Sequence, residues 1–377
     1  MKVLLTASVL SHICQFHRPL IALLKSGGHT VHVAARDNLA EKNGLKLEEA
    51  DRIYNLPFAR SPLSLSNIEA YRQLKQIIDR EHYDVVHCNT PVVGVLSRLA
   101  ARKQRANGTK VFYTAHGFHF YKGAPWKNWV LYYPIEKYMC RYTDTLVTIT
   151  EEDALLAKKH FKVQVFHMHG VGASSKRFYP VSQEEQKRIR QRLGIPDQAS
   201  VVLCTGELLP NKNQKTLLKA TALLKDKLPS LRVYLAGNGP EKDELSRLAN
   251  ELGIGELLTM LGYRTDIDQY VKAADVIVSC SYREGLPLNI MEAMLCAKPI
   301  VASENRGHRE LIQPGVSGIL VPPARPEAYA EALENLFASP SLMQAMQQSA
   351  CARGTLFSDT AIVQELKMLY HLSEQTA

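Results

Sequence analysis

Long apolar runs, internal repeats and low-complexity tracts are all missing from this 377-residue sequence. No stretch approaches the roughly 18 to 20 consecutive apolar residues that span a bilayer, so we expect no integral membrane segment. The lack of a repeat at solenoid periods argues against a solenoid. The apolar start at residues 1–6 is not followed by a small-residue cleavage site, and a first β-strand explains it better than a signal peptide.

Disulfide and zinc-ribbon spacings are also missing. The seven cysteines are scattered without a CxxC pair, which argues against a disulfide framework and a cysteine-ligated metal. We therefore predict buried or idle thiols in a reducing cytoplasm. The cysteines are Cys14, Cys88, Cys140, Cys204, Cys280, Cys296 and Cys351.

Negative charge is scarce in residues 1–180, which hold 25 lysines and arginines against 14 aspartates and glutamates, a net charge of +11. The remaining residues hold 21 basic and 23 acidic side chains, a net charge of −2. A basic first half favours an anionic partner such as an acidic lipid or a phosphorylated substrate, although solubility alone accounts for the charge equally well. The basic charge is the only feature that favours nucleic-acid binding, so we expect no nucleic-acid partner.

Short apolar runs alternate with amphipathic segments along most of the chain, which predicts an α/β fold built on parallel sheets. The predicted strands are 3–6, 30–34, 84–87, 110–114 and 145–149 in the first half, and 200–204, 231–236, 258–261, 275–279, 299–302 and 319–321 in the second. A polar stretch at 171–200 predicts a hinge. We predict one doubly wound domain at 1–180, a second at 181–358, and a terminal helix in 359–377 that returns to the first domain. Two such domains in tandem predict a ligand cleft at the carboxyl ends of their strands.

The most informative segment, SYREGLPLNIMEA, covers residues 281–293. An apolar strand ends at Ser279, a glycine-containing loop follows, and an apolar helix begins near Leu288. Backbone N–H groups at the start of that helix form a natural diphosphate site. Glu284 and Glu292 can each accept hydrogen bonds from paired sugar hydroxyls. The alternative without a function is an ordinary surface loop followed by a helix with an exposed glutamate.

This segment resembles the signature of the retaining glycosyltransferases of family 4, two glutamates separated by seven residues, and the likeness extends over nearly all of the chain. Other motifs follow in the family's order, and this order is far more specific than any one motif. They are Gly206 with Lys212, LAGNGP at 235–240, LGYR at 261–264, Ala274-Asp275, Gly307 before ELI at 310–312, and GVSG at 315–318 before VPP at 321–323. The resemblance implies the GT-B fold, with two Rossmann-like domains, and a retaining, metal-independent hexosyltransferase.

The resemblance also assigns a donor site for a nucleoside diphosphate sugar. It implies that Glu292 binds the ribose, that Glu284 holds the transferred sugar, and that Lys212 and helix-start amides stabilise the departing diphosphate. His116, in the sequence YTAHG, matches the family's histidine near the reacting sugar. The other donor-binding residues would be Gly206, Asn238, Tyr263, Arg264, Gly285, Leu286, Pro287 and Leu288. No cofactor and no metal ion are implied, since the nucleotide sugar is a substrate; a UDP-linked N-acetylhexosamine or another UDP-hexose is our expectation.

Two features depart from the family pattern. The family commonly has arginine directly after the glycine at Gly206, whereas this chain has Glu207, so one positive charge near the diphosphate is missing. Arg264 or a basic group of the first domain could compensate. The first loop, at residues 8–17, lacks the usual paired glycines, so we expect acceptor recognition to differ.

The first domain resembles a narrower branch, the enzymes that build capsular, exopolysaccharide or O-antigen repeat units. The motifs are FHRP at 16–19, HCNTP at 87–91, RLA at 98–100 and AHGFHFY at 115–121. This resemblance implies a sugar on a polyprenyl diphosphate as acceptor. Trp126, Trp129, Tyr132 and Tyr133 on a basic domain would suit a peripheral contact with the anionic inner face of the plasma membrane, or would pack a helix onto the sheet.

Several interpretations stay open. His12, His17 and His119 could orient the acceptor, although packed or exposed histidines are commoner. A zinc site drawn through His87, His116 and His119 has no carboxylate or thiolate to complete it, so we predict none. A sugar-nucleotide 2-epimerase shares the two-domain architecture, and a non-catalytic binding module is a further alternative that the intact Lys212, Glu284 and Glu292 oppose.

Overall fold

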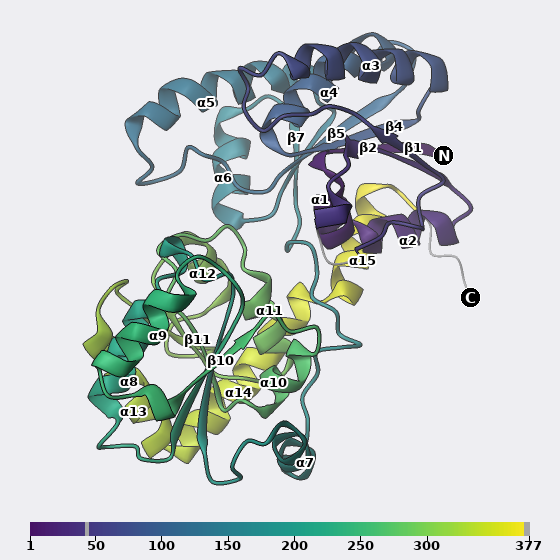
Figure 1. The fold of residues 1–377 in the computed structure, drawn as a ribbon. Coiled ribbons are helices and arrows are strands. Elements are labelled where there is room, and N and C mark those ends of the chain that lie inside the picture. Colours follow the sequence, from purple (N-terminus) through teal and green to yellow (C-terminus); the bar gives the residue numbers. More distant parts are fainter. Residues whose placement is uncertain (42–44, 373–377) are drawn as a thin grey trace. The chain divides into compact units, whose positions relative to one another are not determined.

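The computed structural model describes residues 1–41 and 45–372, and it divides into two compact units. Unit 1 contains Met1–Val171 and the segment that starts at Ile362, and unit 2 contains Gly172–Ala361. Each unit holds one sheet, drawn in Figure 1, and every strand pair is parallel. Two Rossmann-like α/β units are what the sequence predicted.

Unit 1 has a seven-stranded sheet in the order β3-β2-β1-β4-β5-β6-β7. The strands are β1 (Lys2–Val9), β2 (Thr30–Arg36), β3 (Arg52–Asn55), β4 (Val85–Asn89), β5 (Lys110–Ala115), β6 (Thr145–Thr148) and β7 (Gln164–His167). The helices are α1 (Leu10–Phe16), α2 (Arg18–Ser26), α3 (Ser66–Glu81), α4 (Pro91–Arg105), α5 (Trp126–Met139) and α6 (Glu151–His160). The strand order reverses between β1 and β4, and loops that follow these two strands diverge there.

Unit 2 has a six-stranded sheet in the order β10-β9-β8-β11-β12-β13. The strands are β8 (Ser200–Thr205), β9 (Leu231–Ala236), β10 (Leu258–Gly262), β11 (Val276–Ser279), β12 (Ile300–Ser303) and β13 (Ile319–Val321). The helices are α7 (Gln183–Leu193), α8 (Gln214–Leu224), α9 (Lys242–Glu251), α10 (Ile267–Ala273), α11 (Leu288–Leu295), α12 (Arg306–Leu311), α13 (Pro326–Ala338) and α14 (Pro340–Gly354). The last helix, α15 (Asp359–Leu369), begins in unit 2 and continues into unit 1.

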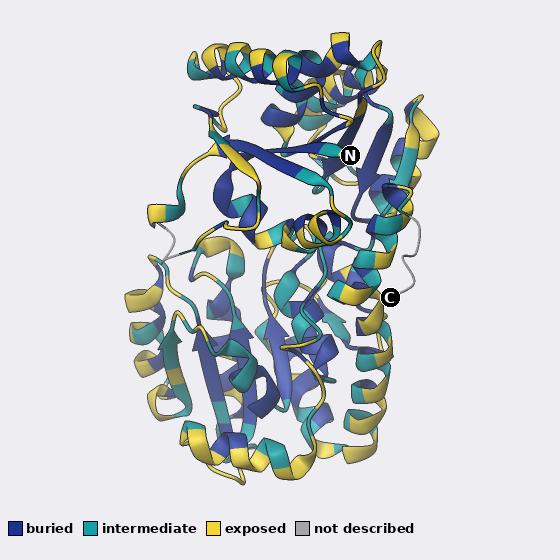
Figure 2. Cartoon of the chain, turned by 90° about the vertical axis from the view of Figure 1, so that its right-hand side faces the viewer, coloured by how far each residue is buried: buried dark blue, intermediate teal, exposed yellow. Residues whose placement is uncertain are grey.

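Apolar side chains bury both faces of the unit 2 sheet. Val201 and Leu203 of β8 face one core, with residues of α10 and α11, while Val202 and Cys204 face the other, with residues of α8, α9 and α13. This alternation follows from the two-residue period of a strand. In Figure 2 the strands are largely dark blue and the outward faces of the helices are yellow. Burial on both faces explains why these strands read as continuous apolar runs in the sequence.

The structure differs from the sequence-based expectation in three places. Residues 183–193, inside the predicted polar hinge, form α7, whose start is capped by the Ser182 hydroxyl accepting from the Glu185 N–H. Residues 10–16, expected as a loop, form α1 directly after β1. The strands β3 and β7 were not predicted, because these edge strands contain no fully buried side chain and lack an apolar run. The final five residues of the predicted terminal segment lie outside the described residues.

The aromatic residues of α5 differ in how far they pack onto unit 1. Trp129 and Tyr133 pack around Phe120, with ring centroids 5.6 Å and 5.5 Å away, and Tyr132 stacks on His119 at 4.5 Å. Trp126 is 70% exposed. Packing onto unit 1 therefore accounts for three of the four aromatic side chains. Among the described residues, no helix is long and apolar enough to cross a membrane.

Candidate active site

In unit 2 the predicted site residues gather where the strand order reverses, between β8 and β11. Gly206 and Glu207 follow β8, and the loop from Tyr282 to Pro287 follows β11. The carboxyl ends of these adjacent parallel strands lie at one edge of the sheet, which is where open α/β sheets bind ligands.

Lys212 and Glu284 form an ion pair at this edge. The Lys212 ammonium lies 2.6 Å from Glu284 Oε1, and the two side chains are 25% and 13% exposed. Lys212 comes from a 3₁₀ turn, Pro210–Lys212, and Glu284 comes from the loop before α11. The structure thus brings together two residues that are 72 positions apart and that the sequence assigned to the same ligand.

Hydrogen bonds to backbone carbonyl groups fix the loop that carries Glu284. The Asn211 side chain donates to the Arg283 carbonyl at 2.9 Å, and the Tyr282 N–H donates to the Asn211 carbonyl at 2.8 Å. At the start of α11, the Asn289 amide donates to the Thr205 carbonyl at 3.1 Å. The Lys212 turn, the Glu284 loop and the end of β8 therefore form one connected piece of structure.

Glycines allow the surrounding backbones to approach closely. At Gly237, where φ is +149°, a Cβ would lie 1.9 Å from the Gly206 carbonyl oxygen. At Gly307 in α12, a Cβ would lie 2.4 Å from the Gly285 carbonyl oxygen and 2.9 Å from Glu284 Cβ. No side chain larger than hydrogen fits at either position without a shift of the backbone.

Glu292 lies within α11, and burial raises its pKa to about 7. The positive charge of Arg177 opposes this rise in pKa, and the negative charge of Asp268 adds to it. Arg177 itself donates from Nε to Asp268 Oδ1 at 2.9 Å. Glu292 is thus a carboxyl group that changes protonation state near neutral pH, which the sequence did not indicate.

The remaining predicted donor residues lie after β9 and β10. Asn238 follows Gly237, and its carbonyl accepts from the Leu208 N–H at 2.9 Å. Tyr263 is 62% exposed, and Arg264 donates twice to Asp266, at 2.8 Å and 2.6 Å. Because Arg264 is engaged by Asp266, it is a poor candidate to replace the positive charge missing at the exposed Glu207.

In unit 1, three histidines meet at the carboxyl ends of the central strands. His12 lies on α1 after β1, His17 follows α1, and His116 follows β5. His12 Nε2 lies 3.3 Å from His116 Nε2, which is 3.1 Å from Asn89 Oδ1 at the end of β4. The ring of His17 lies 5.4 Å from that of His12 and 5.7 Å from that of His116.

The environment of this cluster favours neutral imidazoles. Burial, together with the positive charge of Arg60, lowers the pKa of His12 to about 4. Burial and the neighbouring imidazoles lower the pKa of His17 and of His116 well below the usual value. His87 belongs to the hypothetical zinc site that the sequence analysis considered. Its two ring nitrogens instead form hydrogen bonds with the hydroxyls of Tyr370 and Thr114, each at 2.7 Å.

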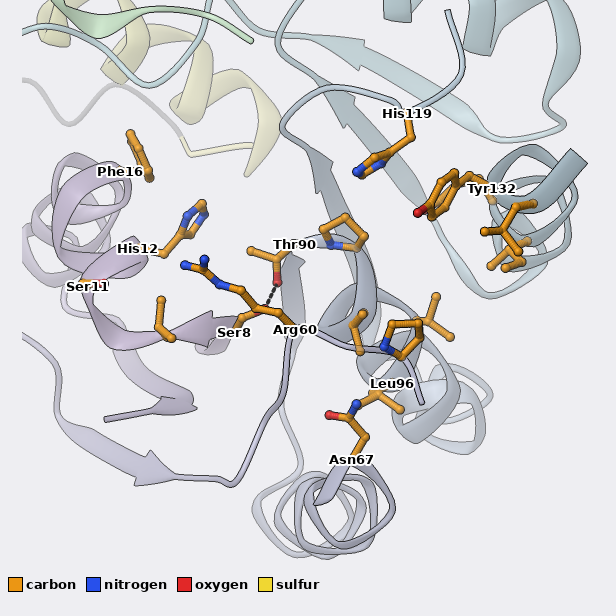
Figure 3. Close-up of a pocket in the computed structure, with 18 of the residues that line it drawn as sticks. Ser8, Ser11, His12, Phe16, Arg60, Asn67, Thr90, Leu96, His119 and Tyr132 are labelled. Carbon is orange, nitrogen blue, oxygen red and sulfur yellow. Dashed lines mark hydrogen bonds between the residues drawn. The ribbon is translucent and has the colours of Figure 1, made fainter. Parts of the chain in front are cut away.

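A pocket of about 670 Å³ opens beside the histidines. Figure 3 shows His12 and Arg60 on one side of it, and His119 and Tyr132 on another. The Ser8 and Thr90 hydroxyls, 2.8 Å apart, lie between them. Most other lining residues are apolar: Val9, Phe16, Pro62, Pro91, Val92, Val95, Leu96, Leu131 and Ile135. The predicted acceptor-side residues His12 and His119 thus line one pocket, whereas His17 does not.

Comparison with known proteins places this chain in a family. Residues 185–353 match the family model "Glycosyl transferases group 1", and residues 2–150 match "Glycosyl transferase 4-like". The chain is 43% identical over 371 residues to "Putative glycosyltransferase EpsD" of Bacillus subtilis (strain 168), an alignment covering 98% of this chain and 96% of that one. The chain belongs to the glycosyltransferases.

Two further comparisons are informative about this transferase. It is 26% identical over 281 residues to the Escherichia coli UDP-Gal:alpha-D-GlcNAc-diphosphoundecaprenol alpha-1,3-galactosyltransferase, covering 73% of this chain and 72% of that one. The crystal structure of Anabaena HepE in complex with UDP and glucose superposes with a TM-score of 0.75 at 22% identity, covering 99% and 100% of the two chains. The architecture is the GT-B fold, as predicted.

Sequence reasoning missed several residues that support the candidate site of unit 2. His308 is buried beneath the Glu284 loop, and its Nδ1 lies 2.6 Å from the Ser303 carbonyl. Asn305 caps α12 by accepting from the His308 N–H at 3.0 Å and donates to the Ser281 carbonyl at 2.9 Å. An Asn three residues before a helical His is a helix-cap signal, but only the fold brings it under Glu284.

Proposed function

We propose that this glycosyltransferase moves a hexose, with retention of configuration, from a UDP-linked donor to a lipid-linked saccharide in cell-surface polysaccharide assembly. The observation that carries the donor assignment is the Lys212–Glu284 ion pair, which lies where the strand order of the unit 2 sheet reverses. The Lys212 ammonium is 2.6 Å from the Glu284 carboxylate. Among similar proteins, HepE has been crystallised with UDP, and the E. coli relative is named for a UDP-Gal donor and a diphosphoundecaprenol-linked acceptor.

In the proposed donor complex, Lys212 and the amides at the start of α11 neutralise the diphosphate. No side chain caps the N-terminus of α11 within the described part of the chain, so its amides can receive an anion. Glu284, held beside Lys212, accepts hydrogen bonds from sugar hydroxyls, and Glu292 accepts from the ribose diol. Tyr263 borders the base.

The proposed reaction is front-face departure of the diphosphate. As the bond between the anomeric carbon and the diphosphate oxygen breaks, negative charge grows on the leaving group and is stabilised by the ammonium of Lys212. The acceptor hydroxyl attacks the same face of the sugar, and its proton passes to the departing phosphate oxygen. The family resemblance assigns His116 to the same sugar, where it positions a hydroxyl. No metal ion is needed in this scheme, because a cation and helix-start amides supply the positive charge.

For the acceptor we propose the pocket of unit 1. Its apolar wall fits the isoprenoid part of a lipid-linked saccharide, and Arg60 and His12 offer polar groups for the diphosphate and the sugar. Exposed apolar side chains lie beside the lining residues on two segments, Leu63 and Leu65 after Pro62, and Val130 beside Leu131. These side chains and the net positive charge favour a peripheral contact with an anionic membrane surface.

The first test measures thermal stabilisation of the full chain by UDP, GDP, ADP and dTDP, each with and without EDTA. We expect stabilisation by UDP alone, unchanged by EDTA. Transfer is then assayed with UDP-hexoses and a polyprenyl diphosphate saccharide, and the anomeric configuration of the product is read by NMR. An inverted product would contradict retention, and formation of an epimerised nucleotide sugar without acceptor would replace the transferase proposal by an epimerase.

A further inference from the structure

The two loops that meet where the strand order of the unit 2 sheet reverses carry balanced charge. Residues 206–213 follow β8, and residues 280–287 follow β11. Their basic side chains are Lys212 and Arg283, and their acidic side chains are Glu207 and Glu284. Lys212 is already paired with Glu284 at 2.6 Å. An anion that binds between these loops therefore meets a neutral ion pair unless Arg283 contributes its positive charge.

Backbone contacts hold Arg283 beside that ion pair. Its carbonyl accepts from the Asn211 side chain at 2.9 Å, and the N–H of the preceding Tyr282 donates to the Asn211 carbonyl at 2.8 Å. Asn211 directly precedes Lys212, and Arg283 directly precedes Glu284. Consecutive Cα atoms are about 3.8 Å apart, so Arg283 is attached one residue away from the carboxylate that holds the Lys212 ammonium.

The Arg283 side chain is available for a ligand. It is exposed, and it forms no ion pair or hydrogen bond with the residues that the structure describes. Arg264, in the loop after β10, instead donates twice to Asp266. A guanidinium presents several N–H donors in a planar fork that fits phosphate oxygens, whereas a lysine ammonium acts as a point charge. Arg283 can therefore bind a phosphate group without giving up an existing side-chain contact.

We propose that Arg283 binds the diphosphate of the nucleotide sugar and supplies the positive charge that is missing at Glu207. The loop after β8 also lies close to the Lys212 ammonium, since a Cβ at Gly206 would be 3.9 Å from Lys212 Nζ. A positive charge attached next to Gly206, or next to Glu284, can thus reach the same diphosphate. The inference rests on the proposed donor site, and it adds a residue that the family resemblance did not assign.

The test compares the affinities of the full chain for UDP and for uridine, both measured by calorimetry. Arg283→Gln should weaken UDP binding at least about tenfold, because a charged hydrogen bond to the diphosphate is lost, and should leave uridine binding unchanged. Arg283→Lys keeps the charge and should weaken UDP binding less. Arg247→Gln is the matched control. Arg247 is exposed in the second half of α9, so this change removes the same charge from unit 2 without altering either loop.

A double variant tests whether positions 207 and 283 serve the same group. Arginine introduced by Glu207→Arg should restore most of the UDP affinity that Arg283→Gln loses. The double variant Glu207→Gln/Arg283→Gln shows how much of that recovery comes only from removing the negative charge of Glu207. We expect its recovery to be the smaller one, because glutamine cannot replace the guanidinium.

Each outcome decides the assignment. Selective loss of UDP affinity in Arg283→Gln, rescued by Glu207→Arg, supports it. Unchanged UDP affinity, an equal loss for uridine, or the same loss in Arg247→Gln overturns it. Lys212→Ala separates this inference from the proposed function. If Lys212→Ala loses UDP binding and Arg283→Gln does not, the donor site stands and the Arg283 assignment is wrong. If the wild type binds no UDP, the donor site itself is wrong and the Arg283 assignment falls with it.

Discussion

The ammonium of Lys212 lies 2.6 Å from the carboxylate of Glu284, and neither side chain is more than 25% exposed. This pair contains the two charges that the proposed chemistry needs, one for the leaving diphosphate and one for the sugar. In the structure each charge neutralises the other. Binding of a diphosphate would give Lys212 a second anionic partner, and the geometry of the pair keeps both groups in place before that happens.

Lys212→Ala and Glu284→Gln should each reduce kcat/KM for sugar transfer by about 100- to 1000-fold, because each removes a group that stabilises charge in the transition state. The assay is steady-state transfer, with circular dichroism to show that the fold is kept. Lys227→Ala is the control: Lys227 forms an ion pair of similar length, 2.7 Å, with Glu334, but both side chains are at least 40% exposed and lie outside the site. Near-normal turnover in Glu284→Gln would contradict the site assignment.

The raised pKa of Glu292 predicts that nucleotide binding depends on pH. Burial raises the pKa of Glu292 to about 7, so below that pH the group is protonated and must lose its proton before it can accept from both ribose hydroxyls. The affinity for UDP should therefore rise as pH increases from 6 to 8, by up to about tenfold per unit on the acidic side. Calorimetry over this range measures the effect. Glu292→Gln removes the titrating group while the phosphate of UDP titrates in both proteins, and identical pH profiles would contradict the role of Glu292.

The same raised pKa affects stability. Because the folded-state pKa lies above the unfolded-state value, the protonated native form is favoured, and stability falls as pH rises from about 4.5 to about 7. Above pH 7 the loss is complete. We expect Glu292→Gln to have a higher melting temperature than wild type at pH 8, and a smaller difference at pH 5. A pH-independent difference would show that Glu292 does not titrate in this range.

The α/β architecture was predictable because most strands are buried on both faces. Strands such as β8 and β11 read as short apolar runs, and their order along the chain predicts parallel pairing. Within the polar stretch at 171–200 the sequence did not predict α7, which buries mainly Ile189 and Arg190 and so has almost no apolar stripe. A helix that packs through one narrow face has too few apolar residues to give a recognisable hydrophobic periodicity in the sequence.

The candidate sites were predictable only in part. Lys212 and Glu284 could be assigned to one ligand from the order of motifs, but their direct contact depends on the turn at Pro210–Lys212. The grouping of His12 and His17 with His116 depends on the β1-β4-β5 strand order, which carries residues 104 positions apart to one edge. No spacing along the chain encodes that meeting, since it is set by long-range pairing.

Gly307→Ala tests whether the close packing of Gly307 against the Glu284 loop outweighs the higher helix propensity of alanine. Alanine in a helix is normally about 1 kcal/mol more favourable than glycine, so the change should stabilise α12 if space were available. A Cβ at this position would instead lie 2.4 Å from the Gly285 carbonyl oxygen, and the Glu284 loop would have to move. We expect UDP binding and transfer to weaken at least tenfold with the fold kept, measured by calorimetry and the transfer assay. Unchanged affinity would show that the position of this loop is not important for the donor.

Arg98 and Glu136 form a buried ion pair next to the unit 1 pocket. Arg98 is 0% exposed, and it donates to Glu136 Oε2 at 2.9 Å and to the Gly94 carbonyl at 2.9 Å, while its guanidinium lies 4.0 Å from the Tyr113 ring centroid. Arg98→Met leaves Glu136 charged in a buried environment and should cost about 3–5 kcal/mol. Arg105→Met, which breaks a pair with the quarter-exposed Asp144, should cost about 1 kcal/mol or less.

The double variant Arg98→Met/Glu136→Gln shows whether the cost comes from the lost contact or from the charge left behind. The Glu136→Gln change removes the negative charge but keeps an oxygen acceptor for the Tyr113 hydroxyl, which is 3.2 Å from Glu136 Oε1 in the wild type. If the stranded carboxylate dominates, the double variant should recover more than half of the loss in urea midpoint seen in Arg98→Met. If the double variant is as unstable as the single one, the arginine stabilises unit 1 mainly through its packing on Tyr113 and its bond to Gly94.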